Sequence, residues 1–399
     1  MKKLRTKAST LITTLVTAAV IGLTGCAASP QANQATGDNS YLPTAEANTE
    51  KYLAGTDREL PASAPKPEPG KKIWVIACSM AAEGCATPAN AAAEAGRKLG
   101  WNMTVQDGRL DPNTYNQLIR QAVAAQVDGL ILAVVDCAPA AEAIKQATQA
   151  GVKVVGTVAL DCSNEYVGGK AEFTAQVSYC ANPTSDPAEL NSCYEKFLKD
   201  EYAGSMADYT ISTRDGKADV IVMQEDDTLE PRIVGNAYQE HMKRCGGCTV
   251  RVVPFTGQDL ISGSLQTKVS AALAQYPTAN AVMIPYDAAG FLGVSAAVKT
   301  AQAQGRDLIM IGAEGLSGAI DQIKSGQGQS FAAGAPTAWW GWAAVDTMVR
   351  VFAGEPQVDQ GIGVQSIDKN HNLPTSTSYY DGNQRSQWRE SYLKIWGVS

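Results

Sequence analysis

The chain has 399 residues, of which 45% are hydrophobic and 18% are charged, with 33 basic and 40 acidic residues. A chain of this length and composition is globular and can form two lobes, each with its own core. The net charge of −7 makes nucleic acid and anionic membrane surfaces poor partners, so we expect neither.

The N-terminus carries the features of an export signal. Four basic residues within the first seven positions precede an apolar stretch, residues 11–23, that is too short to span a bilayer. The sequence LTGC, ending at Cys26, resembles a bacterial lipobox, in which the signal is cut before a cysteine that carries lipid. We expect residues 1–25 to be a lipoprotein signal peptide and Cys26 to hold the exported protein at the outer face of the cytoplasmic membrane or in the periplasm. An ordinary signal peptide with a chance cysteine is the alternative.

The segment after Cys26 predicts a tether. Residues 27–70 show no lasting apolar periodicity and end in the proline-rich stretch PASAPKPEPGKK. Such a composition is typical of a flexible linker with a stiffer end. We therefore expect residues 26–70 to hold the body of the protein away from the membrane, with the lipid as its only membrane attachment.

The remaining eight cysteines are even in number, which in an exported chain indicates disulfides. The sequence leaves the pairing open, and local pairs are preferred. A zinc site formed by His241, Cys245 and Cys248 is an alternative to the last pair, although structural zinc requires a fourth ligand. We expect no metal and no cofactor. The preferred pairs are Cys78 with Cys85, Cys137 with Cys162, Cys180 with Cys193, and Cys245 with Cys248.

From residue 73 onward, short apolar runs alternate with helical patterns. The runs are IWVIACS, MTVQDG, GLILAVVD and KVVGTVAL, and helices are expected from after Pro88 to Leu99, near 111–126 and near 138–151. Runs that are apolar throughout indicate strands buried on both faces, as in a parallel sheet covered by helices. Residues 71–161 are therefore predicted to form one α/β lobe.

The same alternation starts again at ADVIVMQEDD and continues through TVRVVPFTG, AVMIPYD and LIMIGAEG, with a helix between each pair of runs. The sequence thus predicts an α/β fold with two similar lobes, each a doubly wound parallel sheet. The irregular stretch 163–217 is expected at an edge of the second lobe.

Several of these segments are similar to one known family. YNQLIRQAVAAQVDGLILAVVDCAPAAEAIKQATQAGVKVVGTVALD resembles the first-lobe core of type I periplasmic binding proteins, the ribose- and galactose-type solute receptors of ABC importers. EPRIVGNAYQEHM, YDAAGFLGVSAAVKTAQAQG and IMIGAEG resemble second-lobe segments, and GQSFAAGAPTAWWGWAAVDTMVRVFAGE resembles the stretch that returns to the first lobe. The resemblance runs in order from residue 73 to the C-terminus.

The resemblance implies a hinge of three chain crossings with a ligand cleft between the lobes. The first lobe would comprise residues 71–161 and about 336–361, and the second lobe residues 162–335 and about 362–399. It implies a monomer that captures a small polar ligand, for which we expect a monosaccharide or polyol. The protein would deliver this ligand to the membrane subunits of an ABC importer. A lipoprotein that senses its ligand and signals to a membrane receptor is the alternative.

The family binds its ligand at the carboxyl ends of the strands, as open α/β sheets generally do. Carried over by position, the resemblance implies ligand-binding roles for Ser79, Met80, Asp136, Asp161, Arg232, Asp287, Glu314 and Trp339. Asp136 has an alternative role as a helix cap, and Arg232 as a surface residue. At most one of the three neighbouring tryptophans 339, 340 and 342 can face the ligand.

The predominance of carboxylates in this set favours a neutral polyhydroxylated ligand over an amine-bearing one, and both over an anion. Catalysis is not expected, since the chain has two histidines and neither a G-x-S-x-G nor a G-x-G-x-x-G motif in a suitable context. We therefore expect a binding protein and not an enzyme.

Overall fold

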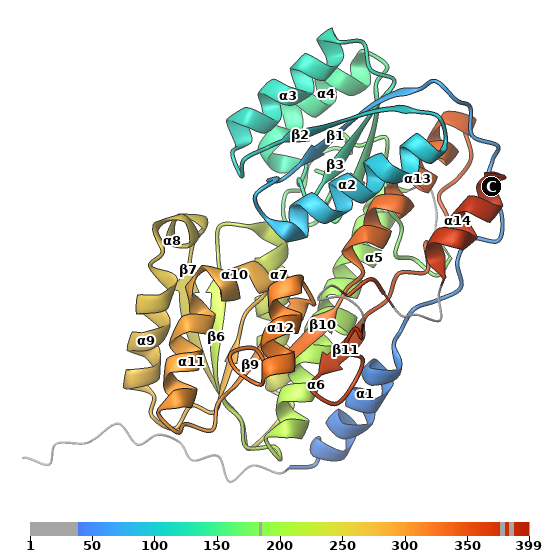
Figure 1. Ribbon diagram of the computed structural model, residues 1–399. Helices are drawn as coiled ribbons and strands as arrows, with labels where there is room; N and C mark the ends of the chain where they lie inside the picture. The colour runs from blue at the N-terminus through green and yellow to red at the C-terminus, as the bar shows by residue number, and fades with distance from the viewer. Residues whose placement is uncertain (1–38, 183–185, 376–379, 383–386, 399) are drawn as a thin grey trace, which may run out of the picture. The chain divides into compact units, whose positions relative to one another are not determined.

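The computed structural model describes residues 39–182, 186–375, 380–382 and 387–398. The signal peptide, Cys26 and the first part of the expected tether lie outside the described residues. The described body contains two sheets covered by helices (Figure 1). This confirms the predicted α/β fold with two doubly wound lobes.

The first lobe is built on a parallel sheet with the strand order β2-β1-β3-β4-β5. Helices α2, α3, α4 and α13 cover it, and α13 packs along α2 (Figure 1). Four of these strands form where the sequence has its apolar runs, and GLILA of β3 is buried at every position. The strands are β1 (Lys72–Ala77), β2 (Asn102–Asp107), β3 (Gly129–Ala133), β4 (Lys153–Thr157) and β5 (Ala175–Gln176), and the helices are α2 (Glu83–Lys98), α3 (Pro112–Ala124), η1 (Ala138–Ala140), α4 (Ala141–Gln149), α5 (Pro187–Lys196) and α13 (Thr337–Ala353).

The second lobe has a six-stranded sheet with the order β11-β10-β9-β8-β6-β7, in which only the pair β10 and β11 is antiparallel. Among the described residues its strands are β6 (Asp219–Glu225), β7 (Thr249–Phe255), β8 (Ala281–Met283), β9 (Ile309–Glu314), β10 (Phe331–Gly334) and β11 (Gln365–Asp368). Its helices are η2 (Phe197–Tyr202), α6 (Ala203–Thr213), α7 (Leu229–Met242), α8 (Gly257–Ser262), α9 (Leu265–Gln275), α10 (Asp287–Ala289), η3 (Gly290–Val294), α11 (Ser295–Ala303) and α12 (Ser317–Ser325).

The structure departs from the expected lobe boundaries in two places. β5 pairs in parallel with β4, so the stretch around residue 175 belongs to the first sheet and not to the second lobe. The last helix, α14 (Trp388–Trp396), packs on α13 of the first lobe, whereas β11 pairs with β10 of the second. Trp339 and Trp342 of α13 stack on Trp388 and Trp396 of α14, which explains the position of this helix.

Helix α2 begins at Glu83 and includes Pro88, whereas the expected helix began only after Pro88. Proline within a helix removes one backbone hydrogen bond and crowds the preceding turn, which is why the sequence favoured a later start. The disulfide between Cys78 and Cys85 ties the first turn of α2 to the end of β1 and opposes that cost.

The expected tether is wrong for residues 42–54, which form helix α1 (Leu42–Ala54) packed against α6. The carboxylate of Asp208 on α6 accepts hydrogen bonds from Tyr41 Oη at 3.0 Å and Asn48 Nδ2 at 2.9 Å. Polar side chains therefore hold this helix, and its buried face contains only Ala45, Thr49 and Tyr52.

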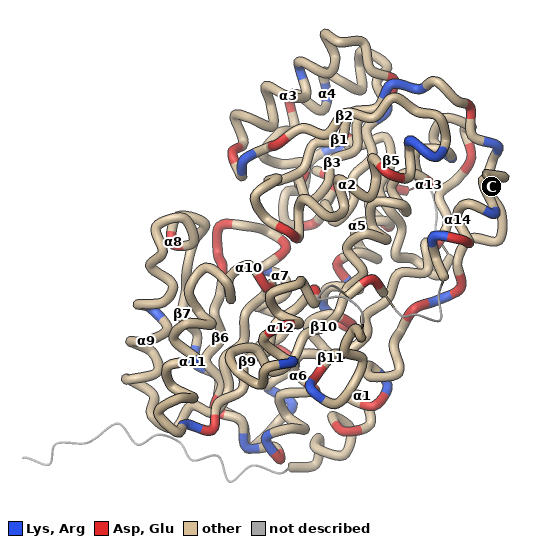
Figure 2. Tube along the Cα trace, in the orientation of Figure 1, with Lys and Arg blue, Asp and Glu red and all other residues tan. Residues whose placement is uncertain are grey.

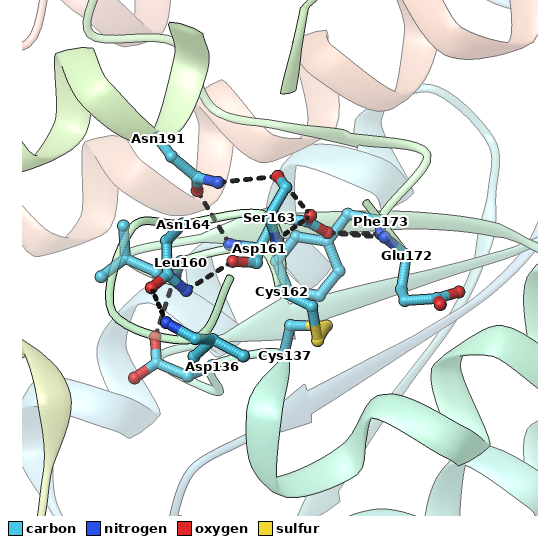
Figure 3. Close-up of a disulfide and its surroundings, with 11 residues drawn as sticks. Asp136, Cys137, Leu160, Asp161, Cys162, Ser163, Asn164, Glu172, Phe173 and Asn191 are labelled. Carbon is cyan, nitrogen blue, oxygen red and sulfur yellow. Dashed lines mark hydrogen bonds between the residues drawn. A yellow bond between two sulfur atoms is a disulfide. The ribbon is translucent and has the colours of Figure 1, made fainter. Parts of the chain in front are cut away.

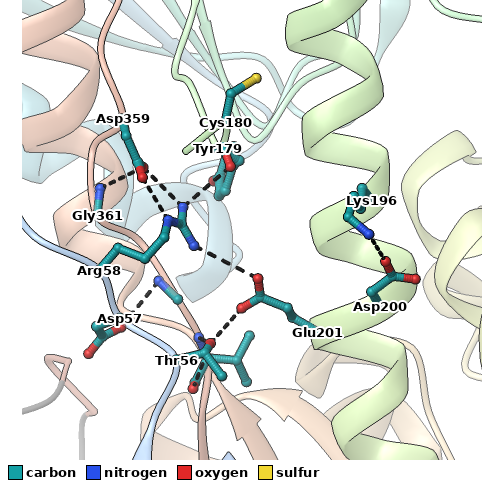
Figure 4. Close-up of polar contacts among 12 residues, drawn as sticks. Thr56, Asp57, Arg58, Tyr179, Cys180, Lys196, Asp200, Glu201, Asp359 and Gly361 are labelled. Carbon is teal, nitrogen blue, oxygen red and sulfur yellow. Dashed lines mark hydrogen bonds and ion pairs between the residues drawn. The ribbon is translucent and has the colours of Figure 1, made fainter. Parts of the chain in front are cut away.

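The chain after α1 runs beside the crossings between the lobes (Figure 4). Arg58 Nε donates to Asp359 at 2.7 Å, and its guanidinium also contacts the carbonyl oxygen of Tyr179 and the carboxylate of Glu201. A Cβ added at Gly363 would lie 2.3 Å from the carbonyl carbon of Thr56, so only glycine permits this close approach. Residues 55–60 are thus a fixed part of the body.

All four predicted disulfides are present: Cys78–Cys85, Cys137–Cys162, Cys180–Cys193 and Cys245–Cys248. The zinc alternative is wrong, because Cys245 and Cys248 are bonded to each other and His241 Nε2 lies 2.9 Å from the carbonyl oxygen of Lys199. Within the described ranges, no group of three potential metal ligands occurs and no helix has the length and apolarity needed to cross a membrane.

Candidate functional site

Asp136 follows β3 and keeps its carboxylate at the carboxyl end of the first sheet. Its Oδ1 accepts the N–H of Leu160 at 2.9 Å, which ties the loops after β3 and β4 together. The nearby helices η1 and α4 have no side-chain cap, so the cap-only alternative does not hold. Burial raises the pKa of Asp136 to about 6.

Ser79 and Met80 lie where β1 ends, as expected. The hydroxyl of Ser79, which is 6% exposed, accepts the N–H of Ala81 at 3.2 Å. The N–H of Met80 donates to Asp107 Oδ1 at 2.9 Å, so a carboxylate at the end of β2 fixes the loop after β1. Sequence reasoning missed this role of Asp107, although it follows from the same strand-end rule.

Asp161 does not have the predicted ligand-binding role (Figure 3). Its side chain is fully buried, and Oδ1 accepts both the N–H and the hydroxyl of Ser163. Oδ2 accepts the N–H groups of Glu172 and Phe173 at 3.0 and 2.6 Å. Four donors therefore occupy this carboxylate, which folds the loop that leads into β5.

Asp287 is likewise occupied by the protein. It is fully buried, and its oxygens accept from Gln329 Nε2 at 2.7 Å and from the backbone N–H groups of Ala313, Gly315 and Leu316. Burial raises its pKa to about 7, against the opposing effect of these donors. Asp287 thus orders the turn after β9. Its oxygens are occupied by these four donors, so the structure does not support the predicted direct contact with the ligand.

Glu314 ends β9 in a left-handed backbone conformation, with φ of 70°. Its Oε2 accepts the N–H of Asp287 at 3.1 Å. Its Oε1 would lie 2.6 Å from a Cβ added at Gly84, so this second-lobe carboxylate reaches the first turn of α2 in the first lobe. Burial and the charges of Asp287, Glu230 and Glu83 raise its pKa well above the usual range.

A second contact joins the lobes at the same place. Glu83 Oε1 on α2 accepts the N–H of Ser317 at 3.1 Å and its hydroxyl at 2.6 Å, at the first residue of α12. A carboxylate at a helix N-terminus is favourable because unpaired N–H groups point toward it. Glu83 and Glu314 therefore connect the facing helix ends of the two lobes.

Glu230, which the sequence analysis did not select, also belongs to this region. It lies in the first turn of α7, and burial together with the charge of Asp136 raises its pKa to about 8. Tyr202 also lies near Glu314 and Glu230, and burial together with these charges raises the pKa of its phenol. Glu230 could have been identified from its position shortly after β6, since the carboxyl ends of parallel strands lie at the same edge of a sheet.

Aromatic rings of α5, of η2 and of the chain after β5 contact one another at tilted angles near these carboxylates. The ring centroids of Tyr179 and Tyr194 are 4.8 Å apart, those of Tyr179 and Phe197 4.6 Å, and those of Phe197 and Tyr202 6.2 Å. We call Tyr179, Tyr194, Phe197 and Tyr202 the aromatic wall.

Arg232 is not brought to the carboxylates. It is partly buried on α7 and makes no side-chain hydrogen bond or ion pair with a residue of the described ranges. Acidic residues gather near α7 and α10 in Figure 2, and Asp136, Glu230 and Glu314 have no ion pair among the described residues. The strand-end region is therefore strongly acidic.

Trp339 faces away from the strand ends. Its indole N–H donates to Tyr392 Oη at 3.1 Å and its ring stacks on Trp388 of α14, so its predicted contact with ligand is wrong. Trp342 packs on the same helix. Trp340 lies next to the end of β4, where its carbonyl oxygen accepts the hydroxyl of Thr157, and its indole N–H has no partner in the described part of the chain. Trp340 is thus the one of the three that fits the site.

Comparison with known proteins identifies the family. A model of the periplasmic binding protein domain matches residues 75–356, whereas no curated protein matches the sequence. Among solved structures, an ABC transporter solute binding protein from Mycobacterium smegmatis with bound glycerol is 18% identical, with a TM-score of 0.62, over 79% of this chain and 100% of that one.

Two further structures show the same fold. A solute binding protein from Agrobacterium vitis bound with alpha-D-tagatopyranose is 17% identical over 78% of this chain and 100% of that one, with a TM-score of 0.62. One from Actinobacillus succinogenes with bound D-allose is 16% identical over 76% and 98%, with a TM-score of 0.61. The two parallel sheets, the strand-end carboxylates of both lobes and the match over residues 75–356 show that the chain belongs to the periplasmic binding protein family.

Proposed function

We propose that this protein is an extracytoplasmic solute-binding lipoprotein that captures a sugar or polyol between its lobes and delivers it to an ABC importer. The observation that carries the proposal is the meeting of carboxylates from both lobes at the strand ends, with Asp136 on one side and Glu230 and Glu314 on the other. The glycerol, tagatose and allose bound by the similar solved structures support a polyhydroxylated ligand.

The contacts between the lobes suggest how capture works. A hydroxyl can donate to a carboxylate on one lobe while a neighbouring hydroxyl donates to the other lobe, so one ligand links both. Glu83 and Ser317 then hold the facing helix ends together. These bonds exist only while the lobes are closed, so they add to the ligand's own contacts with both lobes in stabilising the closed state.

Replacing Asp136 by Ala should weaken ligand binding at least about tenfold, because hydroxyl groups enclosed in the site lose a charged acceptor. The measurement is calorimetry with a panel of monosaccharides and polyols. Asp128→Ala, at an exposed turn before β3, is the control and should bind normally. Unchanged affinity in the Asp136 variant would show that the ligand does not bind at these strand ends.

The lipid anchor has a separate test. Cys26→Ala should move the protein from the membrane fraction to the soluble fraction, because the substituted chain lacks the thiol that carries the lipid. Retention of the substituted protein on membranes washed with salt and carbonate would contradict the lipoprotein assignment.

A further inference from the structure

The strand-end carboxylates Asp136, Glu230 and Glu314 differ from the fully buried Asp161, Asp287 and Asp346 in how few donors they have. Asp161 and Asp287 each accept four hydrogen bonds, and Asp346 accepts from Arg350, Gln360 and Trp396. Each of those carboxylates is fully satisfied by the protein.

By contrast, Asp136 and Glu314 each accept one hydrogen bond, both from a backbone N–H. Glu230 lies beside the Tyr194 hydroxyl, which can donate to one of its oxygens and leaves the other available. All three carboxylates are partly exposed, and none has an ion pair in the described part of the chain. Three acids whose charges repel one another therefore keep free acceptor capacity in one place.

The aromatic wall supplies a second, independent observation. Tyr179 is 7% exposed, yet its hydroxyl has no hydrogen-bond partner among the described residues, and the ring lies near Glu230. Burial and the charges of Glu230 and Asp136 raise the pKa of the neighbouring Tyr194 phenol well above its usual range. Buried hydroxyls without a partner are rare and indicate a missing donor or acceptor.

An ammonium group meets every one of these requirements. It has three N–H donors for carboxylate and hydroxyl oxygens, its charge removes the repulsion among the acids, and aromatic rings attract it. The hydroxyls of a neutral sugar can also donate to these acids, but they leave the repulsion among the ionised carboxylates in place, and an anion would add to it. Arg232, which the sequence analysis placed in the site as its cation, makes no ion pair with these acids.

We infer that the ligand of the inter-lobe site is a sugar or polyol bearing a protonated amine, with Asp136, Glu230 and Glu314 as its acceptors and the aromatic wall beside them. The inference rests on the proposed solute-binding function and names the ligand class of that same site. It changes the expectation drawn from the sequence, which favoured a neutral ligand.

The charge of the ligand has a pH signature. Glu230 faces Asp136, Tyr179, Tyr194, Tyr202 and Glu314, and Glu314 also faces Glu83 and Asp287. Without ligand, Asp136 holds its proton to about pH 6 and Glu230 to about pH 8. A bound cation lowers both pKa values, so binding releases protons and affinity rises with pH across this range. Affinity at pH 7.0 should exceed that at pH 5.5 by at least about tenfold.

Calorimetry on the full mature chain tests the inference with matched sets: glucosamine, N-acetylglucosamine and glucose, and the same three forms of galactose and mannose. At pH 7.0 at least one amino sugar should bind at least tenfold more tightly than its neutral parent and its N-acetyl form, with proton release seen in buffers of different ionisation enthalpy. Equal or tighter binding of a neutral form would overturn the inference that the ligand bears an amine, and would leave the proposed function intact. Silence of every sugar and amino sugar would overturn both.

A variant separates the charge from the shape of the site. Glu230→Gln removes the negative charge with little change in size, and Glu240→Gln, on the exposed side of the same helix, is the matched control. In Glu230→Gln, amino sugar affinity should fall at least tenfold and neutral parent affinity should change less than twofold. The control should bind both as the unsubstituted protein does. An equal loss for both ligands in Glu230→Gln would overturn the inference.

Discussion

Replacing Asp346 by Ala should lower the free energy of unfolding by about 3–5 kcal/mol, because it leaves a buried guanidinium without its counter-charge. Asp346 is fully buried on α13, and its Oδ2 accepts from Arg350 Nε at 2.8 Å. The Arg350 side chain is 5% exposed and would retain only the carbonyl oxygen of Ser63 among its described hydrogen-bond partners.

The same carboxylate connects segments that are distant in sequence. It accepts from Gln360 Nε2, in the chain between α13 and β11, and from Trp396 Nε1 on α14. Through Arg350 it also reaches Ser63, in the segment that follows α1. The lower free energy of unfolding of Asp346→Ala should therefore be seen in urea unfolding followed by circular dichroism and also by the fluorescence of the tryptophans around α14.

The control is Glu240→Ala, which breaks the pair with Lys243. The side chains of Lys243 and Glu240 are 67% and 68% exposed, and ion pairs at such positions contribute about 1 kcal/mol or less. Asp346→Asn, which keeps an oxygen acceptor but loses the charge, should fall between the two. Losses of similar size for Asp346→Ala and Glu240→Ala would contradict this account of the buried pair.

The fold could be predicted because the central strands of both sheets are apolar at most positions. Runs such as Gly129–Ala133 are buried on both faces and have no other stable place than the middle of a parallel sheet. The disulfides were predictable for a related reason, since each joins cysteines 25 residues apart or fewer. Local information was sufficient for both.

Helix α1 could not be predicted in this way. Its buried positions, Ala45, Thr49 and Tyr52, have helical spacing, but they are small or carry a hydroxyl and give only a weak apolar signal. The helix depends on Asp208, more than 150 residues away in sequence, whose carboxylate accepts from Tyr41 and Asn48. A pattern within residues 42–54 could not reveal that partner.

The site residues show the same limit. Asp136 and Asp161 each follow a buried strand of the first sheet, and nothing in their immediate sequence separates them. The difference is that the loop containing Glu172 and Phe173 folds back and donates two N–H groups to Asp161, whereas Asp136 receives one. Which strand-end acid stays available for a ligand therefore depends on donors that arrive from other segments.

Removing the disulfide between Cys137 and Cys162 should lower the free energy of unfolding by about 3.5 kcal/mol, the largest loss of the four. A disulfide restricts the unfolded chain, and by the chain-entropy relation the effect grows with the length of the loop that it closes. This pair closes a loop of 25 residues, compared with 3 for Cys245–Cys248. The same relation gives about 1.5 kcal/mol for the shorter loop.

The comparison uses two double variants, Cys137→Ala with Cys162→Ala and Cys245→Ala with Cys248→Ala, so that no single thiol remains to mispair. Urea unfolding should show the first to be less stable than the second by about 2 kcal/mol. The first pair also has a functional consequence, because Cys137 directly follows Asp136 and Cys162 directly follows Asp161, whose carboxylate folds the loop to Phe173 (Figure 3). Without the bond, the loops after β3 and β4 are held together there by the Asp136–Leu160 hydrogen bond and the contact of Cys137 N–H with the Leu160 carbonyl. Ligand affinity should therefore fall in the first double variant and not in the second, and equal affinity in both would show that the loop is held without the disulfide.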